Sequence, residues 1–208
     1  MARVSQEHLD ARRRQILDGA ALCFARNGFH ATSMQDVLKE VGLSAGAVYR
    51  YFRGKDELIT AIVSEVLADI GEIFESAARQ SPPPPPDVLV VRVLAEVLDL
   101  RPGMREGARS SFPRLMIQVW TETLRDEELS ALIGDVYAKV RGSWMAIVEG
   151  YQEAGVMRAD IPADHVARTM IAMVQGFAAQ YALFDEVPIE ALRDGLRALM
   201  SMGRPAEG

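Results

Sequence analysis

The sequence has little of what secreted, membrane-spanning or metal-binding proteins need. A single cysteine, Cys23, excludes an intramolecular disulfide, and three scattered histidines offer no metal-ligand spacing, so we expect no metal and no cofactor. The first residues contain no apolar signal core, and no apolar run reaches the roughly 20 residues that cross a bilayer. The expected location is therefore the cytoplasm, with no membrane partner.

The sequence also lacks the residue clusters that most enzymes need. No Ser/His/Asp or Cys/His set, pair of catalytic carboxylates or phosphate loop stands out. Cys23 lies beside Phe24 in a helical pattern, where a packed small residue is more common than a nucleophile. Because catalytic groups can be distant in sequence, this absence disfavours an enzyme only when another function is indicated.

The charge is distributed unevenly along the chain. The net charge of −6 at first disfavours a protein that binds nucleic acid. Residues 1–55, however, hold nine Lys or Arg against five Asp or Glu, whereas residues 56–208 hold fourteen against twenty-four. A basic head on an acidic body is the asymmetry expected when only one end meets phosphate. Nearly half of the residues are apolar, which suffices for a core.

Residues 32–55 have the pattern of two short helices joined by a tight turn. Apolar residues recur at helical spacing from Met34 to Val41, and Gly42 ends this helix because glycine readily adopts the left-handed conformation. Ser44 is the expected N-cap of a second helix, predicted over residues 45–52. A helix, a glycine turn and a helix that opens on small residues form a helix-turn-helix signature.

The second helix is suited to approach a DNA duplex. Its small first residues leave room for the backbone, and the amides at a helix N-terminus attract phosphate. Val48 and Phe52 are four residues apart and should face the core, which turns the intervening side chains outward. Tyrosine hydroxyls suit phosphate, and arginine suits a guanine edge or a phosphate. The predicted DNA contacts are Ser44, Ala45, Gly46, Ala47, Tyr49, Arg50, Tyr51 and Lys55.

On spacing alone, aromatic packing with a solvated cationic rim is an equally good interpretation of this segment. A wider pattern favours DNA binding. It comprises R-x-x-I-L at residues 13–17, then Ala21, Phe24, Gly28, Thr32-Ser33, Asp36-Val37, Val41-Gly42-Leu43-Ser44, Gly46, Tyr49-Arg50-Tyr51-Phe52, Lys55 and Leu58. With these residues, the segment resembles the DNA-binding domain of the TetR family of transcriptional regulators. One mild departure is Leu38-Lys39-Glu40, where an alanine-rich stretch is common.

The resemblance implies an all-α protein with two parts. Residues 1–54 would form a three-helix DNA-binding domain with a helix-turn-helix, in which Thr32 or Ser33 caps the second helix and binds phosphate. Residues 55–208 would form a helical effector-binding and dimerisation domain. A helix predicted over residues 55–79 would link the two. Residues 1–8 are predicted to be disordered.

Five consecutive prolines, Pro82 to Pro86, break the helical pattern. A run of this kind favours an extended polyproline helix. It either docks a partner or serves as a stiff spacer, and the spacer is favoured because no flanking basic residue would orient a ligand. Asp87 is the expected cap of the next helix, predicted over residues 88–100.

The last two predicted helices are apolar on two sides, so each needs two packing partners. Small Gly176, Ala179 and Gly195 would let another helix come close. We therefore predict a homodimer through these helices, and the family resemblance implies the same four-helix interface. A twofold dimer would place two reading helices one duplex turn apart, roughly 34–36 Å, on a near-palindromic operator.

The body holds eight of the ten methionines and both tryptophans. Methionine adapts to varied ligand shapes, although such residues at helical spacing are more often plain core. The effector-binding candidates are Met116, Trp120, Trp144, Met145, Met173, Phe177 and Tyr181. The resemblance implies a repressor that a small apolar or amphipathic effector releases from its operator. The alternative is a dimeric DNA-binding protein without an effector, whose body contacts other proteins.

Overall fold

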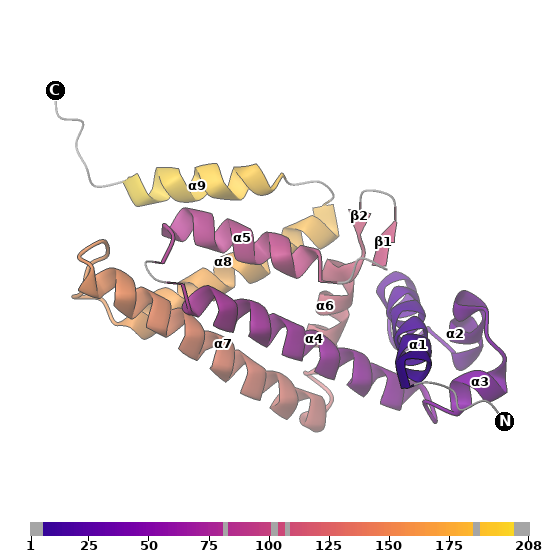
Figure 1. The fold of residues 1–208 in the computed structure, drawn as a ribbon. Coiled ribbons are helices and arrows are strands. Elements are labelled where there is room, and N and C mark those ends of the chain that lie inside the picture. Colours follow the sequence, from indigo (N-terminus) through magenta and orange to yellow (C-terminus); the bar gives the residue numbers. More distant parts are fainter. Residues whose placement is uncertain (1–5, 81–82, 101–103, 107–108, 185–187, 202–208) are drawn as a thin grey trace. The chain divides into compact units, whose positions relative to one another are not determined.

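The computed structural model describes residues 6–80, 83–100, 104–106, 109–184 and 188–201 (Figure 1). Within these residues the chain forms nine α-helices and one two-residue antiparallel strand pair, so the predicted all-α class is confirmed. The elements are α1 (Gln6–Asn27), α2 (Met34–Val41), α3 (Ala45–Tyr49), α4 (Lys55–Ala78), α5 (Pro86–Leu98), β1 (Arg105–Glu106), β2 (Arg109–Ser110), α6 (Phe112–Glu122), α7 (Glu127–Glu153), α8 (Ala163–Phe184) and α9 (Ile189–Ser201).

These elements form two compact units. The first comprises Met1–Leu67 and Leu100–Ile133, and the second comprises Ala68–Asp99 and Gly134–Gly208. The helices α4 and α7 each run from one unit into the other, and α6 belongs with α1, α2 and α3. The predicted boundary between the DNA-binding and effector-binding domains, after residue 54, stays a prediction, because a functional domain need not coincide with a compact unit.

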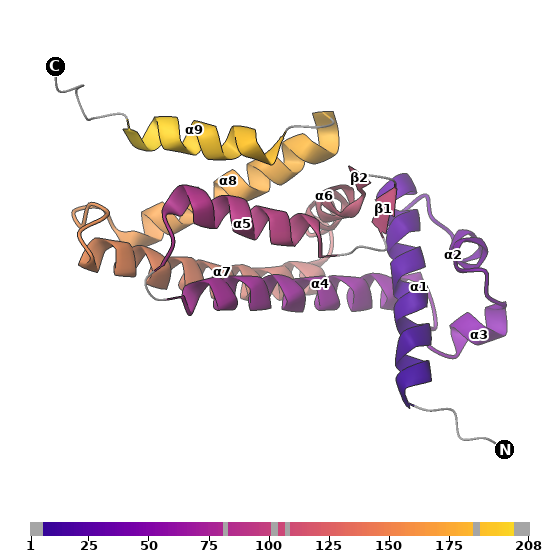
Figure 2. The same ribbon diagram turned by 45° about the horizontal axis from the view of Figure 1, so that its top comes forward.

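The core of the first unit is built around α1, which packs against α2 and α6 (Figure 2). A β carbon at Gly19 would lie only 2.4 Å from Cγ1 of Val41, so the two helices approach as closely as a glycine allows. Cys23 is buried here, as expected of a packed small residue, and burial raises the pKa of its thiol. The fully buried apolar side chains of this core include Ile16, Phe24, Val37, Val48 and Leu58.

Two helix ends in the first unit differ from the sequence-based expectation. The prediction of disorder was wrong for residues 6–8, which belong to α1, whereas residues 1–5 lie outside the described part of the chain. The reading helix α3 ends at Tyr49 instead of residue 52. The amides of Tyr51 and Phe52 both donate to the carbonyl of Val48, so a tight turn replaces the last predicted helical residues.

In the second unit, α5 packs against α8 and α9. The prediction that Asp87 caps this helix was wrong, because α5 already begins at Pro86 with Pro85 as its N-cap. Proline has no amide hydrogen to leave unsatisfied, so it suits the first helical turn. Asp87 is instead buried in that turn, where its Oδ2 accepts a 2.7 Å hydrogen bond from Nε of Arg197 on α9.

The described part of the proline run is anchored to the second unit. The hydroxyl of Tyr151 on α7 donates to the carbonyl of Pro84, and burial raises the pKa of this tyrosine to about 12. Pro86 is buried as the first residue of α5. The prediction of an extended proline run is therefore wrong at Pro86, which is helical. The spacer role of residues 83–85 stays a prediction, and Pro82 lies outside the described residues.

The close approach of α1 and α2 gives a test of the fold. Replacing Gly19 with Ala should lower the free energy of unfolding by about 1–3 kcal/mol, because the new methyl overlaps Val41. Gly71→Ala in α4 is the matched control, since no atom lies within 4 Å of its added β carbon. That variant should unfold like the wild type or be up to about 1 kcal/mol more stable. Urea unfolding of all three proteins measures both effects, and equal stability of the two variants contradicts the prediction.

Candidate nucleic-acid interface

The turn between α2 and α3 is built as the sequence predicts. Gly42 adopts the left-handed conformation with φ 66°, and its amide donates to the carbonyl of Leu38 to end α2. Ser44 then caps α3, with Oγ accepting from the amide of Ala47 at 3.4 Å. Together these two residues turn the chain from one helix into the next within three residues, as a helix-turn-helix requires.

The predicted inner face of the reading segment is confirmed, and so is the outer face at Tyr49 and Arg50, whereas Tyr51 is half-buried. Val48 and Phe52 are buried, whereas Arg50 is exposed and Tyr49 is 47% exposed. Gly46 is exposed, and a β carbon there would touch no atom within 4 Å. No packing inside the protein therefore requires a glycine at this position. The small side chains at the N-terminus of α3 leave space for another molecule to approach its backbone.

The cations of the head fall into two groups. Arg13 is engaged within the protein, because it forms an ion pair with Glu65 on α4 and its guanidinium lies 5.5 Å from the ring centre of Phe52. Arg26 pairs with Glu40 at 2.9 Å. The guanidinium groups of Arg50 and Arg53 are exposed and form no hydrogen bond or ion pair with any described residue.

Arg53 is a candidate contact that the sequence-based prediction missed. The sequence contains one indication of this. Arg53 directly follows Phe52, which is predicted to face the core, so the side chain of Arg53 is expected to point away from the core. The backbone amide of Arg53 donates to Glu57 at 2.6 Å, which fixes the chain there and leaves the side chain open to solvent.

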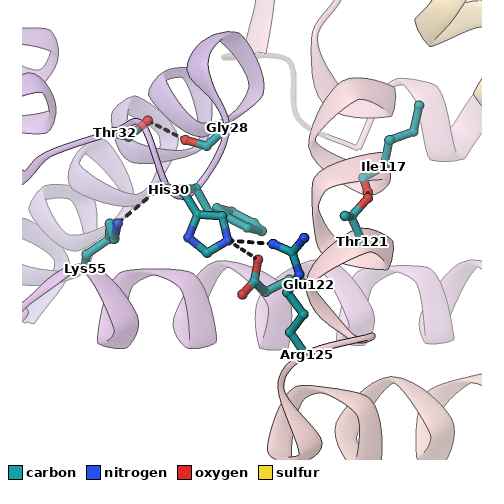
Figure 3. Close-up of polar contacts among 9 residues, drawn as sticks. Gly28, His30, Thr32, Lys55, Ile117, Thr121, Glu122 and Arg125 are labelled. Carbon is teal, nitrogen blue, oxygen red and sulfur yellow. Dashed lines mark hydrogen bonds and ion pairs between the residues drawn. The ribbon is translucent and has the colours of Figure 1, made fainter.

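Two of the predicted phosphate contacts are already used inside the protein. The hydroxyl of the buried Thr32 donates to the carbonyl of Gly28 at 2.8 Å, and the ammonium of Lys55 donates to the carbonyl of Phe29 at 2.9 Å (Figure 3). Both bonds hold the loop between α1 and α2. The Lys55 ammonium keeps further donors, so its predicted phosphate contact stays a prediction, as does that of Thr32.

Ser33, the other predicted phosphate contact before α2, is exposed and forms a capping box. Its Oγ accepts from the amide of Asp36 at 3.3 Å, and Oδ2 of Asp36 accepts from the amide of Ser33 at 2.9 Å. The hydrogen bonds from the side chain and backbone of Ser33 lower the pKa of Asp36. The N-terminus of α2 is therefore rigid and exposed, which suits contact with a backbone phosphate.

The structure places the effector candidates in different parts of the chain. Met116 and Trp120 lie half-buried on α6 in the first unit, and the other five lie in the second unit on α7 and α8. Trp144 is fully buried, packs edge-on against Phe74 at 5.5 Å, and its Nε1 has no acceptor among the described residues. Met145 and Tyr181 are half-buried.

Met173 and Phe177 line a groove of about 450 Å³ between α8 and α9. The groove also contains Gly176 and Gly195, where an added β carbon would touch no atom within 4 Å. Leu199 lines it from α9 and is 64% exposed. The groove lies on the two helices predicted to pair with a second copy, and that pairing stays a prediction.

A second cleft, of about 370 Å³, lies within the first unit beside the start of α4. It is lined by carboxylates and apolar side chains, namely Asp56, Ile59, Glu122, Asp126, Glu128, Leu129 and Leu132, together with Thr60 and Ser64. In the described part of the chain, no three histidine, cysteine or carboxylate side chains converge on a possible metal position. None of the described helices is both long and apolar enough to cross a membrane.

Comparison with known proteins identifies relatives of both halves. Residues 16–62 match the family model "Bacterial regulatory proteins, tetR family". Residues 90–202 match the model "BetI-type transcriptional repressor, C-terminal". An HTH-type transcriptional repressor of Mycobacterium tuberculosis is 46% identical over 65 residues, which are 31% of this chain and 35% of that protein.

Solved structures share the fold over nearly the whole chain. A transcriptional regulator from Saccharomonospora viridis in complex with choline has a TM-score of 0.72 at 22% identity, covering 93% of this chain and 97% of that one. The transcriptional regulator FadR from Bacillus subtilis in complex with stearoyl-CoA has a TM-score of 0.67 at 17% identity, covering 92% and 99%.

The capping box can be tested by its pH dependence. Replacing Ser33 with Ala should lower the free energy of unfolding by about 1 kcal/mol near neutral pH. Because folding lowers the pKa of Asp36, its contribution is present above the ordinary value of 3.8 and is lost as the pH falls through the lowered value. The difference between the variant and the wild type should therefore shrink in acid. Urea unfolding over a pH series measures it, and a difference that grows in acid contradicts the assignment.

Proposed function

The chain belongs to the TetR family of bacterial regulatory proteins, and we propose that it represses transcription as a homodimer on a near-palindromic operator until an effector releases it. Its coarser function, that of a helix-turn-helix transcriptional regulator, follows from the family. Proteins of this family are generally not enzymes, which agrees with the absence of a recognisable catalytic cluster in the sequence.

The DNA-binding proposal rests on which side chains of α3 and the following turn are buried and which are exposed. Buried Val48 and Phe52 anchor it from behind, while its small first residues and Arg50 face solvent. Arg50 and Arg53 lack partners among the described residues, so neither must break an internal ion pair to reach DNA. Arg50 on the reading segment is the proposed base reader, and Arg53 after it is a proposed phosphate contact. The predicted contacts Ser44, Tyr49, Tyr51 and Lys55 would add affinity that does not depend on sequence.

Selection of bound duplexes from a random pool, at fixed salt, tests this proposal. The purified chain should enrich a near-palindromic site whose half-sites lie about one duplex turn apart. Weak binding that varies with salt but enriches no sequence would contradict a sequence-specific regulator.

The same selection separates the two arginines. Arg50→Ala should lose discrimination at one base position of each half-site, by about 1–3 kcal/mol, because the side chain reads a base edge. Arg53→Ala should weaken all duplexes alike and lower the salt dependence, because a phosphate contact releases counterions. If Arg50→Ala instead weakens every sequence equally, Arg50 is a phosphate contact.

The α8–α9 groove supports the proposed homodimer. Its apolar lining and its two open glycines would receive the same two helices of a second copy, and burial of exposed Leu199 would favour association. Residues 55–208 would then provide dimerisation and effector binding, and residues 1–54 would provide DNA binding.

A charge placed in the groove tests this interface. Leu199→Glu should shift the light-scattering mass at micromolar concentration from two chains to one, because a carboxylate would be desolvated between the copies. Leu124→Glu, at a position that is 84% exposed in the first unit, is the control and should leave the dimer intact. A wild-type mass of one chain, or an unchanged mass for Leu199→Glu, contradicts the interface.

The proposed effector is a small apolar or amphipathic molecule that binds in the body. The indole N–H of Trp144 is a buried donor without an acceptor among the described residues, and a buried water or an acceptor on such a ligand would satisfy it. The effector would favour a state in which α4 holds the heads apart, with a coupling of about 1–3 kcal/mol. The rival proposal is a regulator that responds to no effector. A candidate ligand is excluded as the effector if the protein binds its operator equally well with and without it.

A further inference from the structure

The loop between α1 and α2 contacts one face of α6, and both belong to the first unit. Gln118 and Glu122 are four residues apart on that face, and Arg125 follows in the next turn. A β carbon at Gly28 would lie 3.2 Å from Oε1 of Gln118. His30 Nε2 lies 3.2 Å from Oε2 of Glu122 and 3.4 Å from Nη1 of Arg125 (Figure 3).

Nε2 of His30 cannot serve both neighbours in the same state. A ring nitrogen either carries a hydrogen and donates, or presents a lone pair and accepts. With a hydrogen, Nε2 donates to the carboxylate of Glu122. Without one, it accepts from the guanidinium of Arg125. The hydrogen on Nε2, which the imidazolium and one of the two neutral tautomers carry, therefore determines which residue holds the loop.

Charged side chains around His30 affect whether Nε2 bonds Glu122 or Arg125. Its side chain is 71% exposed, whereas that of Glu122 is 19% exposed. The charged groups that face the loop are Glu122 from α6, Arg125 from the following turn, and Lys55 from α4, which binds the carbonyl of Phe29. Asp56 and Asp126 line the same cleft as Glu122. Protonated His30 gains a charge-assisted bond to Glu122, although it also faces the positive Arg125.

The position of the loop connects this contact to DNA. Thr32 and Ser33, the two predicted phosphate contacts, follow His30 by two and three residues, and Ser33 caps α2. Lys55 holds the loop toward α4, and the hydroxyl of Thr32 holds it toward α1 by donating to the carbonyl of Cys23 at 3.3 Å. His30 holds it toward α6. A loop that is already ordered before binding loses less conformational entropy on the operator.

We propose that His30 is a positioning residue for operator binding, and that its bond to Glu122 holds the loop ahead of α2 most firmly when the imidazole is protonated. This rests on the proposed function, because its readout is operator affinity. His30 touches no DNA in the proposal and acts through the loop that presents the N-terminus of α2. Operator affinity should then be higher when the imidazole is protonated than when it is neutral.

The test is fluorescence anisotropy with the selected operator duplex at about pH 6 and about pH 8, at one ionic strength. His30→Ala should bind about two- to fivefold more weakly than the wild type at the lower pH, as expected for an exposed ion pair. His30→Gln should keep wild-type affinity at the higher pH, because its amide can both donate and accept. The wild type should gain affinity on acidification relative to His30→Gln, and Glu122→Gln should remove this gain.

Glu128→Gln is the matched control, since Glu128 lines the same cleft but does not contact His30 among the described residues. It should keep the wild-type pH profile, and thermal unfolding should show that all variants remain folded. Equal affinity of His30→Ala and wild type at both pH values, or an unchanged pH gain in Glu122→Gln, overturns the positioning role. If the wild type selects no duplex, the proposed function fails together with this inference. If it selects one while His30→Ala binds equally well, only the positioning role fails.

Discussion

The approach of α1 to α2 at Gly19 is the constraint on which the head depends. Cγ1 of Val41 occupies the space that a side chain at position 19 would need, so this contact fixes the end of α2. The amide of Gln15 on α1 also donates to the carbonyl of Val41 at 3.1 Å. Because the chain turns at Gly42 directly afterwards, α1 determines where α3 begins and in which direction its exposed face points.

The features that were predicted correctly from the sequence are those set by local chemistry. Gly42 and Ser44 mark a helix end and a helix start through their own conformational preferences, and Val48 and Phe52 reveal the buried face by their spacing. That spacing is the same whether the last residues are helical or form a turn, so the end of α3 was misplaced. The start of α5 was missed because Asp87 is the better cap in isolation, whereas its carboxylate instead meets Arg197 from a distant helix.

The roles of the cations and of the large apolar residues depend on tertiary contacts that spacing does not encode. Spacing alone does not show that Arg13 is held by Glu65, whereas the guanidinium of Arg53 has no partner in the described structure. Likewise, Trp144 and Met173 both recur at helical spacing. One is fully buried against Phe74, whereas the other lines an open groove on α8 and α9.

The grouping of α6 with α1, α2 and α3 bears on how heads and bodies can be exchanged between relatives. The first compact unit is not a single contiguous segment, because it comprises Leu100–Ile133 as well as Met1–Leu67. A recombinant that joins residues 1–54 to a foreign body would set α1 against an unmatched α6. A chimera that keeps this packing needs additional crossover points, so that α6, which packs against α1, comes from the same protein as α1.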